Sequence, residues 1–85
     1  MNNDIDNLKK RLIYRSQYRG TKEMDKLIGS FVKNYIDEFD ENDLKDLEIF
    51  LNNDDDILYK IYNKELDVIN LNGTKIINLF KNYIL

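Results

Sequence analysis

Residues 21–39 read TKEMDKLIGSFVKNYIDEF, and this stretch decides the fold class. Its apolar side chains recur three, four and seven positions apart, which is the spacing of a buried stripe on one face of a helix. Thr21 is expected to cap this helix, and Glu23 and Asp25 fall in its first turn, where the helix dipole stabilises acids. Gly29 within the helix indicates a close crossing with a neighbouring helix. The stripe consists of Met24, Leu27, Ile28, Phe31 and Tyr35, extended by Ile36 and Phe39.

Helical periodicity continues on both sides of this stretch. Before it, a basic helix is expected to end at Gly20, since glycine commonly follows the last turn of a helix. After it, three further segments carry apolar stripes and begin at Asp or Thr residues that can cap a helix. We expect these four helices at about residues 7–18, 40–53, 54–63 and 74–84, the second of them ending at the Asn52-Asn53 pair.

The chain is therefore expected to be all-α, a compact five-helix bundle in a single helical domain over residues 1–85. Eighty-five residues cannot divide their apolar surface between two cores, and the 42% hydrophobic content is enough for one core. No pair of segments makes a convincing case for strands. Residues 64–73 stay ambiguous, because their apolar positions alternate only loosely and Asn72-Gly73 indicates a turn.

The residue types that the chain lacks limit its chemistry. It contains no cysteine and no histidine, which removes thiol nucleophiles, thiolate metal sites and the commonest general base. Ser16 and Ser30, its only serines, have no imidazole to activate them, so we expect a protein that is not an enzyme. No apolar run is long enough to cross a bilayer and no signal-peptide pattern is present, so a cytoplasmic protein without membrane insertion is expected.

Charge is divided unevenly between the two halves of the chain. Residues 1–35 carry eight basic and four acidic side chains, whereas residues 36–85 carry five basic and twelve acidic ones. All three arginines, Arg11, Arg15 and Arg19, lie in the first half, although the chain is otherwise rich in lysine. Because the guanidinium group suits carboxylates and phosphates at interfaces, this end of the molecule is expected to meet an acidic partner surface.

Two other features each allow a chemical and a structural interpretation. The acids at residues 54–56 could suggest a calcium loop, but they are consecutive, no glycine separates them from Glu65 at the twelfth position, and a helix cap with solvated acids is favoured. Tyr14 and Tyr18, one turn apart beside two arginines, could stack on bases or on a partner protein. Core packing is favoured for Tyr14, whereas core packing and partner contact are equally supported for Tyr18.

Residues 11–25 read RLIYRSQYRGTKEMD and bring these features together. Arg19, Gly20 and Glu23, placed between a basic aromatic helix and an amphipathic helix, match an RGxxE motif. This arrangement resembles the succinate dehydrogenase assembly factor family, the SdhE-type proteins of bacteria with their mitochondrial relatives. The similarity covers about residues 8–62, which is most of the chain, and the five expected helices agree with it.

The resemblance extends into the second half of the chain, with some departures. The Glu-Met-Asp run that starts at Glu23 matches the family, residues 44–51 match its third helix, and residues 54–59 resemble its D-D-P-D-L-Y/F segment. The departures are Asp56 where the family usually has proline, Ile57 where it has aspartate, Ile61 where tryptophan is common, and Tyr14 at a position that is often tryptophan.

The resemblance implies an assembly factor and not an enzyme. Members of this family promote covalent attachment of FAD to the flavoprotein subunit of succinate dehydrogenase, and in some bacteria of fumarate reductase. The flavin–histidine bond forms by the flavoprotein's own chemistry, while the factor supplies proximity and orientation, which fits a chain without histidine. The implied partner is that flavoprotein subunit. FAD belongs to it, and this chain is expected to be a monomer that binds no cofactor stably and no metal or nucleic acid.

The resemblance also implies roles for the residues of the Arg-Gly-Glu corner. Gly20 allows the turn between two helices and lets a partner backbone approach closely. Arg19 is expected to make a bidentate contact with a partner carboxylate, and Glu23 to accept from a partner donor or to hold Arg19. The complete set of expected partner-binding residues is Arg11, Tyr14, Arg15, Tyr18, Arg19, Gly20, Glu23 and Asp25.

Two other classes of function remain open at this point. A nucleic-acid-binding helical module would use residues 21–35 as its recognition helix, although the apolar stripe and the net charge of −3 oppose this. An unrelated helical adaptor would use the same basic end for a different protein partner. A salt-dependent shift of DNA would support the first class, and the proteins captured from a native lysate would separate the second from an assembly factor.

Overall fold

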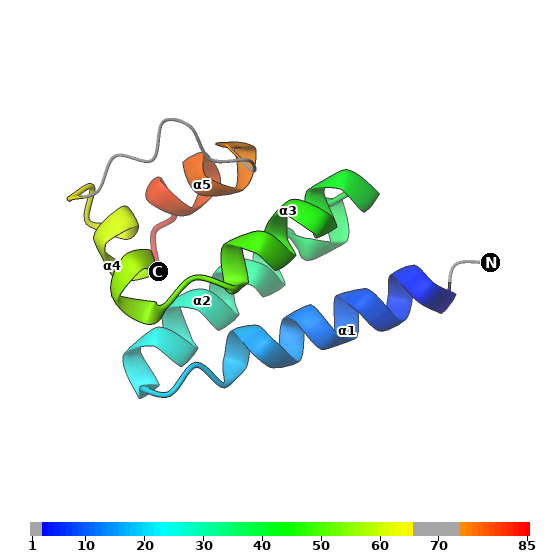
Figure 1. Cartoon of the computed structure of the whole chain (residues 1–85), viewed down its shortest axis with the longest axis horizontal. Helices are drawn as coiled ribbons and strands as arrows, with labels where there is room; N and C mark the ends of the chain where they lie inside the picture. Colours follow the sequence, from blue (N-terminus) through cyan, green and yellow to red (C-terminus); the bar gives the residue numbers. More distant parts are fainter. Residues whose placement is uncertain (1–2, 66–73) are drawn as a thin grey trace.

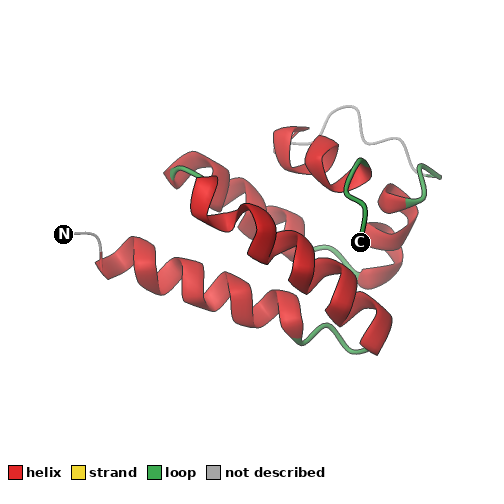
Figure 2. Cartoon of the chain, turned by 180° about the vertical axis from the view of Figure 1, so that it is seen from behind, coloured by secondary structure: helices red, strands yellow, loops and turns green. Residues whose placement is uncertain are grey.

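The structure is a computed structural model that describes residues 3–65 and 74–85 of the chain. These residues form five α-helices and one short 3-10 helix (Figure 1), and no strand occurs among them (Figure 2), so the predicted all-α class is confirmed. The ambiguous segment of the sequence falls almost entirely outside the described residues. In chain order the elements are α1 (Asn3–Gln17), α2 (Lys22–Tyr35), η1 (Ile36–Glu38), α3 (Glu41–Leu51), α4 (Asp55–Tyr62) and α5 (Thr74–Lys81).

The helix α2 forms as its sequence predicts. Thr21 has extended backbone, and its hydroxyl oxygen accepts a hydrogen bond from the Met24 amide at 3.2 Å. The predicted stripe faces the core, with its members in α2 buried except for Tyr35, which is half-buried and packs against the core. The regular helix ends at Tyr35, because the chain tightens into η1 there and leaves Phe39 in extended backbone.

The helix α1 lies along α2 and α3 (Figure 1). It begins at Asn3, four residues earlier than expected, and its inner face places Leu12 fully inside the core. At the crossing of α1 and α2, a Cβ added to Gly29 would lie 3.3 Å from Cγ of Gln17. The close crossing predicted at Gly29 is therefore confirmed, since a side chain at this position would have to displace the side chain of Gln17.

The buried apolar residues of all five helices form one cluster, and Phe31 of α2 stands near its centre. The ring centroid of Phe31 lies 5.9 Å from that of Phe50 in α3, 5.2 Å from that of Phe80 in α5, and 5.5 Å from that of Tyr83. The backbone carbonyl of Tyr83 also accepts a hydrogen bond from the Tyr62 hydroxyl of α4 at 2.8 Å. These contacts hold the end of the chain against α2, α3 and α4.

The later helices begin close to the predicted positions. Asp40 caps α3, because its carboxylate accepts from the Asp43 amide at 2.8 Å and the Asp43 carboxylate accepts in return from the Asp40 amide at 3.2 Å. Asp54 precedes α4, but its side chain makes no capping hydrogen bond. The fifth helix ends at Lys81 and does not continue to Ile84, which is 87% exposed. None of the described helices is long and apolar enough to span a bilayer.

Candidate functional site

The corner between α1 and α2 is shaped by a glycine and a carboxylate. The chain leaves α1 after Gln17, and Gly20 takes a φ of +125°, which residues with a Cβ rarely adopt. Asp25, in the first turn of α2, accepts hydrogen bonds from the backbone amides of Arg19 and of Gly20, the latter at 3.3 Å. Its charge also lies near the positive end of the α2 dipole. Asp25 therefore serves the corner itself.

The side chain of Arg19 turns inward and fastens this corner to the connection between α3 and α4. It is only 10% exposed, and each nitrogen of its guanidinium group donates one hydrogen bond. Nε donates to Oδ1 of Asp55 at 2.9 Å, Nη1 to the carbonyl of Leu51 at 2.7 Å, and Nη2 to the carbonyl of Asn53 at 2.6 Å. We call this set of contacts the Arg19 clamp.

The Arg19 clamp differs from the role that the sequence suggests. A partner carboxylate was the expected contact, whereas the carboxylate that Arg19 binds is Asp55 of the same chain. The physical reason is that α3 ends at Leu51, and its last carbonyls need donors that the helix itself does not provide. Glu23 is exposed and makes no hydrogen bond to Arg19 among the described residues, so it does not hold the guanidinium group.

The two other arginines of α1 also face the chain's own second half. Arg15 Nη2 donates to Oδ1 of Asn52 at 2.7 Å, and Arg11 Nη2 lies 3.9 Å from Oε2 of Glu48. The Arg11 pair is long and largely exposed, so it contributes little to stability, whereas the contact of Arg15 is short. Together with Arg19, the arginines follow α3 at intervals of four residues. Of the three arginines, only Arg19 forms a short and largely buried ion pair with an acid in the described part of the same chain.

Two tyrosines project outward beside these arginines. Tyr14 is 64% exposed and Tyr18 is 66% exposed, and their ring centroids are 4.5 Å apart with the ring planes tilted by 34°. The core position favoured for Tyr14 is wrong, because Tyr14 follows the buried Leu12 by two residues, which places it about 200° round the helix. Exposing rings of this size to water is unfavourable, so covering them with a partner would lower the free energy.

Gly20 and Glu23 complete the part of the corner that faces solvent. Both are exposed, and the nearest atom to a Cβ built on Gly20 would be Oδ2 of Asp55 at 4.0 Å, so the backbone of Gly20 is open to approach. We define the corner surface as Tyr14, Tyr18, Gly20 and Glu23. It offers two aromatic rings, bare backbone and one carboxylate, which are groups that bind a protein surface by packing and hydrogen bonding.

The acids before and within the first turn of α4 show mixed behaviour. Asp54 and Asp56 are exposed, as predicted for solvated acids, whereas the prediction is wrong for Asp55, whose side chain is 27% exposed and paired with Arg19. Within residues 3–65 and 74–85, no group of three or more carboxylates is arranged to hold a metal ion.

A further ion pair joins α3 to α5, away from the corner. Nζ of Lys75 donates to Oδ2 of Asp43 at 3.0 Å, and the Asp43 side chain is 12% exposed. The hydrogen bond from Lys75 holds the pKa of Asp43 below its ordinary value, and the same bond raises the pKa of Lys75. This pair supports the packing of α5 and has no contact with the corner surface.

Sequence reasoning missed the residues that receive the arginines. Asn52 and Asp55 carry side-chain acceptors, and the interval of four between Glu48 and Asn52 matches the interval between Arg11 and Arg15. That matching interval is a signal the sequence contains. The carbonyls that complete the Arg19 clamp carry no such signal, because any residue type supplies one.

Comparisons with known proteins agree on one family. Residues 10–84 match the family described as "Flavinator of succinate dehydrogenase". The chain is 30% identical over 80 residues to "Succinate dehydrogenase assembly factor 2, mitochondrial" of Dictyostelium discoideum, an alignment that covers 94% of this chain and 57% of that protein. It is 40% identical over 58 residues to the protein of the same name from Scheffersomyces stipitis, covering 68% of this chain and 39% of that protein. No solved structure matches the chain.

Proposed function

This chain belongs to the family of succinate dehydrogenase flavinators, and from that premise we propose that it binds the flavoprotein subunit of succinate dehydrogenase and promotes covalent attachment of FAD to that subunit. The chain spans 57% and 39% of the lengths of the two relatives, so the activity proposed is that of the matched region. Fumarate reductase, which the family resemblance also implies, is a second candidate client.

The exposed tyrosine pair is the observation that carries this proposal. The Arg19 clamp and Asp25 hold the corner rigidly, and α1 then presents Tyr14 and Tyr18 as two adjacent rings on its outer face. A pre-formed aromatic pair loses little conformational entropy when a partner covers it. Arg19 and Asp25 thus act as positioning residues, and the tyrosines are the proposed contacts.

The proposed role is that of an assembly factor and not of an enzyme. The proposed acceptor of the flavin is a histidine of the partner, since this chain has no histidine that could form a flavin–histidine bond. FAD supplies the electrophilic ring for the bond when it is bound to the flavoprotein. The residues of the corner surface bind and orient that protein, and orientation alone removes a large part of the entropic barrier to a bond-forming step.

A nucleic-acid role is less well supported. The exposed outer face of α2 carries Lys22, Lys26 and Lys33, but the net charge of −3 opposes the approach of phosphates. Arg15 and Arg19 are engaged with α3 and the start of α4, which removes two fixed charges from any phosphate contact.

The compartment and the oligomeric state remain predictions. A cytoplasmic, bacterial monomer is what the sequence suggests, whereas both relatives are named as mitochondrial proteins. Fractionation of the source cells with an antibody against the chain tests the compartment, and light scattering after size-exclusion chromatography tests the monomer.

The function itself is tested by co-expressing the chain with the flavoprotein subunit in cells that lack any other such factor. In-gel flavin fluorescence then reports the covalent flavin. We expect strong fluorescence with the wild type and weak fluorescence with the double variant Tyr14→Ala/Tyr18→Ala. The matched control Tyr14→Phe/Tyr18→Phe keeps both rings and is expected to retain most of the fluorescence. Fluorescence that is equal with and without the chain would rule the function out.

A further inference from the structure

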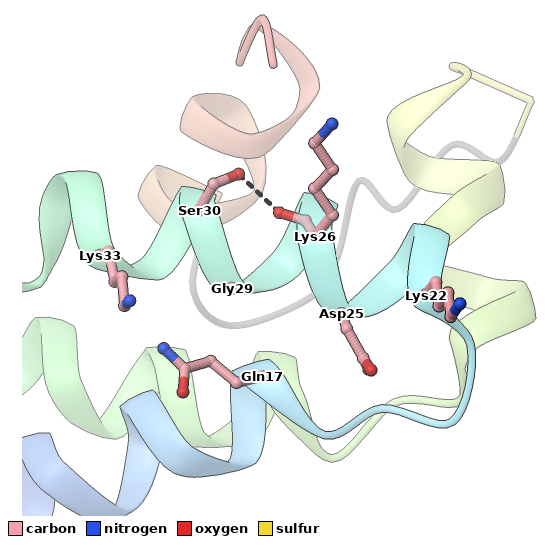
Figure 3. A pocket seen from close by; sticks show the side chains of 7 residues that line it. All are labelled: Gln17, Lys22, Asp25, Lys26, Gly29, Ser30 and Lys33. Carbon is pink, nitrogen blue, oxygen red and sulfur yellow. Dashed lines mark hydrogen bonds between the residues drawn. The ribbon is translucent and has the colours of Figure 1, made fainter.

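A shallow hollow of about 420 Å³ lies on the outer side of α2, where the end of α1 crosses it. Figure 3 shows Gly29 in its middle, Lys33 on one side, Lys22 and Asp25 on the other, and Gln17 of α1 below. We call it the basic hollow, lined by Lys22, Lys26 and Lys33 with Gln17, Asp25, Gly29 and Ser30.

The charge of the basic hollow is positive and uncompensated within the described part of the chain. Lys22, Lys26 and Lys33 are all exposed, and no carboxylate of residues 3–65 or 74–85 lies within ion-pair distance of their ammonium groups. The one acid of the lining is Asp25, and its Oδ1 already accepts hydrogen bonds from the backbone amides of Arg19 and Gly20. Lys22 and Lys26, four residues apart on one face of α2, repel each other, and an anion bound between them would relieve this repulsion.

Of the polar side chains between the lysines, the amide of Gln17 can donate to a ligand, whereas the Ser30 hydroxyl already donates within α2. The hydroxyl of Ser30 donates to the carbonyl of Lys26 at 2.7 Å, and the side-chain amide of Gln17 points toward the hollow from α1 (Figure 3). Gly29 is buried, and Cγ of Gln17 lies 3.3 Å from the position that a Cβ would take, so the Gln17 side chain covers the helix at this point. Ammonium and amide donors suit a ligand that carries several acceptor oxygens.

The distances along α2 favour an extended ligand over a compact one. From Lys22 to Lys33 the helix rises about 16 Å, with about 6 Å between Lys22 and Lys26. An extended polypeptide repeats its side chains on one side about every 6.6–6.8 Å, so alternate acids match the closer pair of lysines. One phosphate group cannot reach three ammonium groups spread in this way. The net charge of −3 on the chain opposes the binding of nucleic acid, whose phosphates are also negative.

We propose that the basic hollow is a second binding site, which takes an extended acidic segment of a protein partner with its carboxylates on Lys22, Lys26 and Lys33. It goes beyond the proposed function, because it names a surface along α2 that is distinct from the tyrosine pair on the outer face of α1. It also stands independently of that function, since the acidic segment is recognised by charge and spacing and not by a flavin.

The test is fluorescence anisotropy with a fluorescein-labelled peptide of alternating glutamate and glycine at low ionic strength. We expect saturable binding that weakens as salt is added and falls by about tenfold or more in Lys26→Glu/Lys33→Glu. The matched control is Lys60→Glu/Lys64→Glu, which changes the net charge equally on exposed residues outside the hollow. The control is expected to bind within about twofold of the wild type, and circular dichroism checks that both variants fold.

Three outcomes would overturn this site. The first is the absence of saturable binding by the wild type, and the second is an equal loss of binding in both double variants, which would mean that only overall charge matters. The third is tighter binding of inorganic tripolyphosphate or of single-stranded DNA to the hollow than of the peptide. Lys26→Ala/Lys33→Ala, which adds no negative charge, is expected to weaken the peptide in the same direction but less.

Discussion

Nε of Arg19 donates to Oδ1 of Asp55 at 2.9 Å and so joins two residues that are 36 positions apart in the chain. The bond connects the basic first half with the acidic second half at the corner where α1 ends. The guanidinium group of Arg19 is thus bonded within the chain. The outward tyrosines, Gly20 and Glu23 are the exposed groups that a partner could reach.

Replacing Arg19 should destabilise the fold. Arg19→Ala removes an ion pair and two hydrogen bonds from a side chain that is 10% exposed, and we expect a loss of about 2–3 kcal/mol in the free energy of unfolding. Urea denaturation followed by circular dichroism measures it. Arg11→Ala is the control, because Arg11 is 66% exposed and 3.9 Å from Glu48, and it should cost less than about 0.5 kcal/mol. Equal costs for the two variants would contradict the Arg19 clamp.

Replacing Gly20 should strain the corner. Its φ of +125° is rarely adopted by residues with a Cβ, so Gly20→Ala is expected to lower the free energy of unfolding by about 1–3 kcal/mol. Gly29→Ala is the matched control within a helix. Alanine there adds about 1 kcal/mol of helix propensity, which offsets the cost of crowding Gln17. The same denaturation experiment compares the two, and a larger loss in Gly29→Ala would count against the conformation of the corner.

The pair of Asp43 and Lys75 should make stability depend on pH. Because the pKa of Asp43 is lowered in the folded state, its contribution is present above the ordinary value of 3.8 and is lost as pH falls through the lowered value. The raised pKa of Lys75 gives a contribution that is present below 10.5 and is lost as pH rises through the raised value. We expect Lys75→Met to flatten the acid side of the curve of unfolding free energy against pH.

The control for this pH experiment is Lys45→Met. Nζ of Lys45 lies 3.9 Å from Oε2 of Glu41 and the Lys45 side chain is 65% exposed, so its loss should leave the curve nearly unchanged. Thermal or urea unfolding between about pH 2 and pH 5 gives both curves. An acid limb that is as steep in Lys75→Met as in the wild type would show that the pair does not control it.

The exposed tyrosine pair should matter for binding and hardly for stability. Tyr14 and Tyr18 touch each other and solvent more than the core, so Tyr14→Ala/Tyr18→Ala should change the free energy of unfolding by less than about 1.5 kcal/mol. The same variant should weaken binding of the flavoprotein subunit by about 1–2 kcal/mol per ring, measured by isothermal titration calorimetry. Unchanged binding together with an intact fold would exclude the pair as the contact.

Local sequence patterns predicted the helices because apolar spacing and capping residues act within a single helix. The apolar stripe and the cap at Thr21 together predict α2. The predicted crossing at Gly29 follows from the absence of a Cβ at that position. The errors lie at helix ends. Tyr83 was expected inside the last helix, but it packs on Phe31 from the segment after Lys81, and only tertiary contacts determine that end.

The partner-binding site stays a prediction, and the structure shows contacts within the chain that the sequence did not reveal. The sequence places Arg19 beside Gly20 and cannot reveal that Asp55 lies within reach, because that contact depends on the path from α3 to α4. Tyr14 was assigned to the core by residue type, whereas its position relative to Leu12 puts it outside. Contacts between distant residues therefore decide which members of a motif hold the fold and which are free to bind.

The proposed function depends on covalent flavin appearing on the partner because of this chain. Purified flavoprotein subunit without flavin, mixed with FAD, should gain covalent flavin faster when the chain is added, and protein mass spectrometry follows the fraction modified with time. We expect Tyr14→Ala/Tyr18→Ala to lose most of this acceleration, and Tyr14→Phe/Tyr18→Phe to keep it. An equal rate of modification with and without the wild-type chain would contradict the proposed function.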